Sequence, residues 1–108
     1  MKKEKSNKWT LEDLQKLPFS AVKILSVFVE QNKKVLDSID LQKALEKEGI
    51  TGRKFGAVMA SFGKYGKEEP LLHSVLRISR GNSRWVISEK YLPMIKEYIS
   101  QVAQYLKK

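Results

Sequence analysis

The stretch that decides the fold is LQKALEKEGITGRKFGAVMASF, residues 41–62. Apolar residues recur in it at helical spacing and predict one helix over residues 39–48 and a second over residues 52–65. Gly49 stands where a helix commonly ends in a left-handed residue, and Thr51 is suited to cap the next helix two residues later. The stretch therefore predicts two short helices joined by a tight turn, which is a helix-turn-helix unit.

The two helices are each expected to bury one face. In the first helix the inward residues are expected to be Ile39, Leu41, Ala44 and Leu45. In the second they are expected to be Phe55, Val58, Met59 and Phe62. The outer face of the second helix combines small residues with basic ones: Arg53, Lys54, Gly56, Ala57, Ala60, Ser61 and Lys64. Small side chains let a helix approach base edges closely, and the charges can reach phosphates. A small face also suits helix packing, but the surrounding charge favours nucleic acid.

After residue 70 the periodicity changes from helical to extended. Val75, Leu76 and Ile78 predict one strand, and Trp85, Val86 and Ile87 predict a second. Residues 79–84, Ser-Arg-Gly-Asn-Ser-Arg, are rich in turn formers and suit a hairpin loop. A last helix is expected over residues 92–107, with Pro93 near its start.

The chain before residue 39 is expected to begin with a polar, basic and disordered tail, residues 1–9. Thr10 and Asp13 form a capping-box pattern ahead of a short helix, residues 11–17, and Pro18 either ends that helix or opens the next. A long helix follows over residues 19–32. Val35-Leu36 is too short for an independent strand but can pair at a sheet edge. The predicted class is α+β, mostly α, with one domain over residues 10–90 and a further helical element over residues 91–108.

All four arginines lie between residues 53 and 84, whereas the other 17 basic residues are lysines spread over the whole chain. Arginine grips phosphate or a guanine edge with two hydrogen bonds at once, so its concentration in one stretch indicates a ligand contact. We expect these guanidinium groups to meet on one side of the fold. The formal net charge of +9 also indicates a polyanionic partner.

Several classes of protein do not fit the sequence. The chain has no cysteine, which excludes disulfides and zinc-thiolate sites and suits a reducing cytoplasm. No apolar run approaches the roughly 18 residues of a membrane span, so no membrane partner is expected. His73 is the only histidine, and no acid or thiol is placed to form a catalytic set with it. We therefore expect no enzyme activity, no cofactor and no metal site.

The order of helix, helix-turn-helix, basic hairpin and C-terminal helix resembles the winged helix-turn-helix DNA-binding superfamily over roughly residues 19–90. Small archaeal chromatin and transcription proteins and bacterial repressors of the MarR type look like its nearest broad relatives. The resemblance implies that the second helix of the unit enters the major groove and that the hairpin touches the neighbouring backbone or minor groove.

The expected DNA contacts come from that helix and from the hairpin. They are Arg53, Lys54, Ala57, Ser61, Lys64, Arg77, Arg80, Asn82 and Arg84. A solvated hairpin whose charges only prevent aggregation is the alternative interpretation of the arginines in the loop. Asn82 can read a base or supply turn geometry, and the turn is the favoured interpretation.

The last helix carries apolar residues at alternating spacings of three and four. They are Leu92, Ile95, Ile99, Val102 and Leu106, with a second row of tyrosines at 91, 98 and 105. One such row can pack on the body of the same chain. Two rows are wider than that contact needs, so the pattern predicts a homodimer through this helix.

The sequence thus predicts a dimeric protein that binds double-stranded DNA, located in the cytoplasm on the nucleoid. It would act as a transcription regulator or as a chromosome- or plasmid-organising protein. The alternatives are a protein-docking module that does not bind DNA, and RNA binding by the same basic surface.

Overall fold

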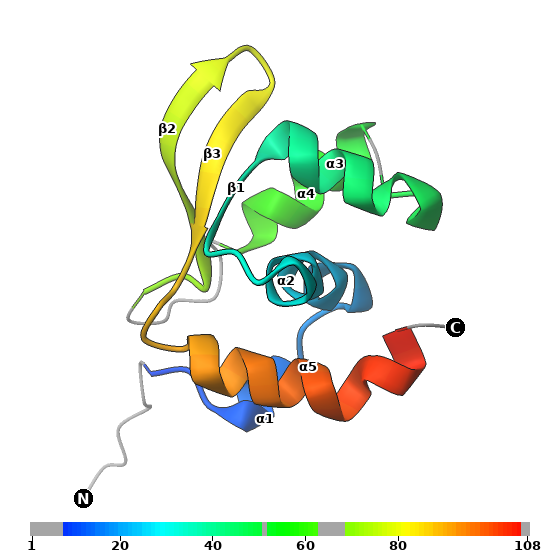
Figure 1. Ribbon diagram of the computed structural model, residues 1–108, viewed down its shortest axis with the longest axis vertical. Helices are drawn as coiled ribbons and strands as arrows, with labels where there is room; N and C mark the ends of the chain where they lie inside the picture. The colour runs from blue at the N-terminus through cyan, green and yellow to red at the C-terminus, as the bar shows by residue number, and fades with distance from the viewer. Residues whose placement is uncertain (1–7, 51, 63–68, 107–108) are drawn as a thin grey trace, which may run out of the picture.

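The computed structural model describes residues 8–50, 52–62 and 69–106, which form a compact α+β fold (Figure 1). The α+β class is therefore confirmed. The elements in chain order are α1 (Leu11–Gln15), α2 (Phe19–Gln31), β1 (Val35–Asp37), α3 (Ser38–Leu45), the 3₁₀ helix η1 (Glu46–Glu48), α4 (Gly52–Ser61), β2 (Leu72–Ser79), β3 (Asn82–Ile87) and α5 (Leu92–Leu106).

The helix ends follow local chemistry. The Thr10 hydroxyl accepts a hydrogen bond from the Asp13 amide at 3.2 Å, and the Asp13 carboxylate accepts one from the Thr10 amide at 2.9 Å, so the predicted capping box is confirmed. Pro18 precedes α2 as its N-cap residue. Gly49 is left-handed, with φ 78°, as predicted for the end of the helical segment before α4.

The sheet is antiparallel, with strand order β1-β3-β2. The predicted pairing of the short segment around Leu36 is confirmed, because Leu36 lies opposite Trp85 on the central strand. The connection between β2 and β3 is tighter than the predicted loop over residues 79–84. Ser79 already pairs with Asn82, so only Arg80 and Gly81 turn the chain, and Gly81 takes a positive φ of 76°.

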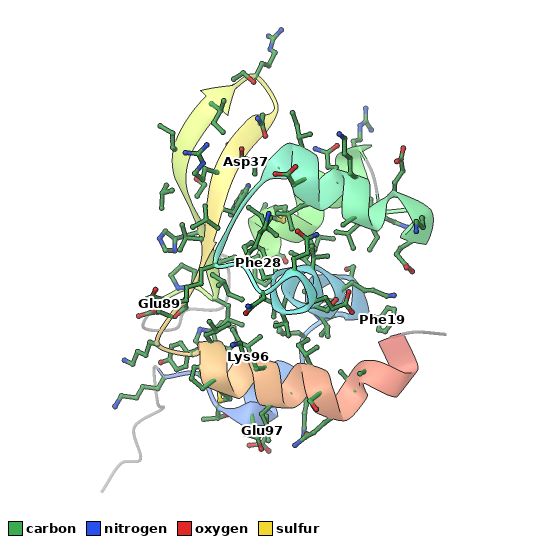
Figure 2. The ribbon with its side chains drawn as sticks, in the orientation of Figure 1. Phe19, Phe28, Asp37, Glu89, Lys96 and Glu97 are labelled. Carbon is green, nitrogen blue, oxygen red and sulfur yellow. The ribbon has the colours of Figure 1, made fainter. Side chains whose placement is uncertain are left out.

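Helix α2 lies at the centre of the molecule, between α3 and α4 on one side and α1 and α5 on the other (Figure 1). All its residues from Ala21 to Phe28 are buried, as is usual for a helix covered on more than one side. Phe28 lies in the middle of the core (Figure 2). The burial extends to Lys23, whose ammonium group pairs with the Glu48 carboxylate at 3.1 Å.

Two details of the predicted organisation are wrong. Ile39 and Ala44 are exposed, because α3 turns only the row containing Leu41 and Leu45 toward the core. Trp9 does not belong to the tail, since it is buried and its indole N–H donates to the Glu69 carbonyl at 2.8 Å. The predicted extension of α4 to residue 65 lies largely outside the described residues, as does Thr51.

Candidate nucleic-acid interface

Helix α4 separates its side chains as the sequence predicts. Phe55 and Met59 are buried in the core, and Phe62 continues that face beyond the end of the helix. Arg53, Lys54, Gly56, Ala57 and Ala60 are all exposed. The helix thus presents a surface of small side chains with two basic residues near its N-terminus, where free backbone amides and the helix dipole also favour anions.

A cavity of about 400 Å³ separates α4 from the hairpin formed by β2, β3 and their turn. We call it the α4–hairpin groove. Its lining residues come from three elements and are Gly52, Phe55, Gly56, Met59 and Ala60 of α4, Gly81, Ser83 and Trp85 of the hairpin, and Ser38 and Gln42 at the start of α3. Helix α4 and the hairpin, which are distant in sequence, therefore border one continuous depression.

Ser38 fixes the hairpin to the beginning of α3. Its hydroxyl accepts hydrogen bonds from the Ser83 amide at 3.1 Å and from the Trp85 indole at 3.0 Å, and donates to the Ser83 carbonyl at 3.2 Å. The hydroxyl is thereby used in three bonds to a single strand, β3. No local sequence pattern indicates this anchor, because the partners of Ser38 lie more than 40 residues away along the chain.

Asn82 is a structural residue. It is buried, and its side-chain oxygen accepts a hydrogen bond from the Ile39 amide at 3.2 Å. It thereby caps α3 from outside the helix, while the Asp37 side chain makes no cap hydrogen bond. The engaged oxygen gives Asn82 a role inside the fold, and a contact between Asn82 and DNA stays a prediction.

The hairpin arginines lie on two faces of the sheet. Arg77 lies opposite Ser83 in the β2–β3 register, so the two residues share the face that borders the α4–hairpin groove. Arg80 is exposed in the turn. Arg84 instead lies opposite Leu76 and Asp37, one residue out of phase with Ser83, and therefore on the other face.

Arg84 also has a partner within the chain. Its Nε donates to the Asp37 carboxylate at 3.0 Å. This hydrogen bond, together with the carboxylate charge, raises the pKa of the Arg84 guanidinium above its ordinary value. The expectation that all four arginines meet on one side is consequently wrong for Arg84, because strand alternation and Asp37 hold it on the opposite face.

Three further residues predicted to contact DNA, on α4 and just after it, are Ser61, Lys54 and Lys64. The half-buried Ser61 donates its hydroxyl proton to the Val58 carbonyl of its own helix at 2.6 Å. Lys54 lines a separate cavity of about 380 Å³ together with Phe19 and Lys23 of α2. Figure 2 shows Phe19 on the side of the molecule away from the sheet. Lys64 lies outside the described residues.

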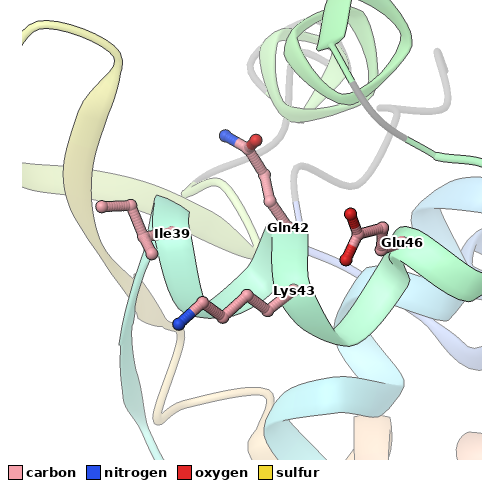
Figure 3. A pocket seen from close by; sticks show the side chains of 4 residues that line it. All are labelled: Ile39, Gln42, Lys43 and Glu46. Atoms are coloured by element: carbon pink, nitrogen blue, oxygen red, sulfur yellow. The ribbon is translucent and has the colours of Figure 1, made fainter.

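A third, smaller pocket of about 250 Å³ lies on α3 and the start of η1. Ile39, Gln42, Lys43 and Glu46 project around it (Figure 3). Gln42 lines both this pocket and the α4–hairpin groove, because it follows Ser38 by four residues and shares its helix face. Sequence reasoning missed Gln42. Its one available signal was this spacing from Ser38.

The predicted dimer row on α5 faces the chain's own core. Ile95 and Ile99 are 0% and 4% exposed, Tyr91 and Tyr98 are buried beside them, and Leu92 and Val102 are half-buried. The prediction that this row is free for a second copy is therefore wrong for Ile95 and Ile99, because both rows are needed to cover α1 and α2. The side chain of Leu106 lies outside the described residues.

Among the residues that the structure describes, none of the helices has the length and apolar character to cross a membrane. The same residues contain no group of three or more histidine, aspartate or glutamate side chains able to hold a metal ion. Comparisons of the chain with protein-family models, with curated proteins and with solved structures give no significant match.

Proposed function

We propose that this chain is a winged helix-turn-helix protein that binds double-stranded DNA. In this proposal α4 enters the major groove and the hairpin contacts the adjacent backbone and minor groove. The observation that carries it is the α4–hairpin groove, because it joins the small, basic face of α4 and the hairpin into one surface. The strand order β1-β3-β2, with β1 just before the helix-turn-helix unit, supports the same proposal.

Charge distribution also supports a polyanionic ligand on this surface. No acidic residue occurs in the sequence of α4, and none occurs between Pro70 and Ser88, the segment that contains the hairpin. The acidic residues nearest in sequence to α4 are Glu46 and Glu48 of η1. The side of the molecule formed by α4 and the hairpin is therefore suited to phosphates. A protein partner of this basic surface would have to be acidic.

Within this proposal the residues divide by role. Arg53, with Ala57 beside it on the exposed side of α4, faces the bases, and Arg77 and Arg80 contact phosphates. Lys54 contacts the backbone on the other side of α4. Arg84 holds Asp37 and has only a secondary part in binding. A homodimer stays a prediction, and it would need a surface other than the one containing Ile95 and Ile99.

The test is a mobility-shift titration with a random 30-base-pair duplex over a series of salt concentrations. Roughly four phosphate contacts per protomer give a slope of log K against log salt of about −4. An Arg77→Gln/Arg80→Gln variant, which removes two of the proposed phosphate contacts, should flatten that slope by about 2. Lys96→Gln, an exposed position on α5, is the matched charge control and should leave the slope unchanged.

The outcomes separate the candidate functions. Absence of binding at micromolar protein in low salt would reject the proposal and favour a docking module. Equal or tighter binding to duplex RNA of the same length would move the ligand class to RNA. Selection of bound sequences from a random pool distinguishes a regulator, which enriches a defined site, from an organiser of the nucleoid, which does not.

A further inference from the structure

The outer half of β2 exposes large apolar side chains for which the fold gives no use. Val75, Leu76 and Ile78 are 52%, 51% and 42% exposed. They lie on the hairpin, whose turn marks the end of the molecule's long axis opposite α5 (Figure 1). Arg77 stands between the last two of them, and Arg80 follows in the turn. Arg77 lies on the face that borders the α4–hairpin groove, whereas Leu76, which pairs with Arg84, lies on the other face. The tip of this narrow, projecting ribbon therefore carries an apolar side chain on one face and a guanidinium group on the other.

Pairing with another β-strand does not explain these side chains. β2 is an edge strand, but the β2–β3 register shifts between Ser74 and Leu76 and again between Arg77 and Ser79. Bulges of this kind disturb the regular ladder and are a common protection of edges against strand addition.

A second copy of the chain does not explain them either. Each copy has a net charge of +9, and residues 70–88, which contain these apolar residues and the hairpin arginines, include no acid. The Asp37 carboxylate of β1 is already paired with Arg84. Bringing two such tips together would place like charges in contact in a low-dielectric interface, which opposes association.

We propose that Leu76 and Ile78 form an apolar wedge that enters the minor groove of DNA and bends the duplex, while Arg77 and Arg80 hold the flanking phosphates. The inference rests on the DNA-binding function proposed above. Its basis is charge complementarity: a basic ribbon carrying aliphatic side chains matches a ligand with a polyanionic backbone and apolar base faces. Proteins that insert aliphatic side chains between base steps kink the duplex by about 20–90°.

The wedge would give the protein an architectural activity in addition to binding. DNA that is bent at the hairpin folds back toward the protein and can contact more of its basic surface. Flexible pyrimidine–purine steps should be preferred under the wedge, because they unstack most easily. The preference would appear at positions that no hydrogen-bonding side chain reads.

The experiment measures energy transfer between dyes at the two ends of a 30-base-pair duplex with one central TA step, using the full chain. The wild-type protein should raise the transfer efficiency at saturation. The variant Leu76→Thr/Ile78→Thr should bind with an unchanged salt slope, because no charge is removed, but leave the duplex straight. Threonine keeps the β-propensity of the strand, and both positions are exposed, so the variant should fold, as circular dichroism will show.

Val35→Thr is the matched control. Val35 is 44% exposed and belongs to the same sheet, but it pairs with Val86, far from the turn. It should leave the bend intact. Wild-type binding without bending, or equal bending by the wild type and the double variant, overturns the wedge and leaves the binding proposal standing. Absence of any binding rejects both. A dimer in sedimentation that the double variant abolishes would assign the patch to a second copy and also overturn the wedge.

Discussion

The hydroxyl of Ser38 offers the sharpest test of how the hairpin is held. Substitution Ser38→Ala removes the acceptor of the Ser83 amide and of the Trp85 indole, and the donor to the Ser83 carbonyl. An orphaned buried polar group costs about 1–3 kcal/mol. Because Ser83 and Trp85 are half-buried, water reaches part of the site, and we take the lower part of that range for each of the two donors. The expected loss in the free energy of unfolding is therefore about 2–3 kcal/mol.

Urea denaturation at pH 7, followed by far-ultraviolet circular dichroism, measures this loss. The slope with denaturant should stay the same, since the substitution does not change the surface exposed on unfolding. Ser100→Ala, at an exposed position of α5, is the control and should change the free energy by less than about 0.5 kcal/mol. In a double-mutant cycle with Trp85→Phe, the coupling energy should exceed about 0.5 kcal/mol. A Ser38→Ala loss below about 0.5 kcal/mol would refute the assignment of Ser38 as the anchor of the hairpin.

Three further predictions follow from the same contacts. Asn82→Ala should lower the free energy of unfolding by about 0.5–2 kcal/mol, as expected for loss of a helix cap, and an unchanged urea midpoint would contradict the capping role. In salt titrations of DNA binding, Arg80→Gln should flatten the slope of log K against log salt by about 1. Arg84→Gln should change that slope less, because Asp37 already neutralises the Arg84 guanidinium. A larger effect of Arg84→Gln than of Arg80→Gln would refute the assignment of Arg80 to phosphate contact and of Arg84 to Asp37. Ile95→Ala should lower the free energy of unfolding by about 2–5 kcal/mol, because it leaves a cavity in the core of a single chain. The loss should be the same at 2 and 50 μM protein, and a loss that depends on concentration would support a dimer through α5.

The C-terminal helix shows where a sequence pattern stops being informative. The row containing Ile95 and Ile99 correctly indicated a buried face, but a pattern of apolar spacing does not tell which chain covers it. The width of the apolar face was misleading because α5 covers two helices of its own chain, α1 and α2 (Figure 1). An intramolecular partner of that width could not be anticipated before the helices were placed in space.

The sequence likewise predicts one part of the candidate nucleic-acid interface and not another. The exposure of Arg53 and Ala57 and the burial of Phe55 on α4 could be predicted, because one helix with a 3.6-residue period fixes which side chains share a face. Arg84 could not be separated from Arg77 in advance. That separation depends on the β2–β3 register and its shifts, and on Asp37 of β1 lying beside β3.

The amino-acid sequence by itself determined the helices, the tight turn at Gly49 and the pairing segment around Leu36, because local spacing, capping and glycine conformation act over a few residues. Only the tertiary structure decided that Asn82 caps α3, that Ser38 anchors the hairpin and that the α4–hairpin groove exists. These features join residues more than 20 positions apart along the chain. Their hydrogen bonds and ion pairs depend on distances of about 3 Å between atoms, which no periodicity along the chain encodes.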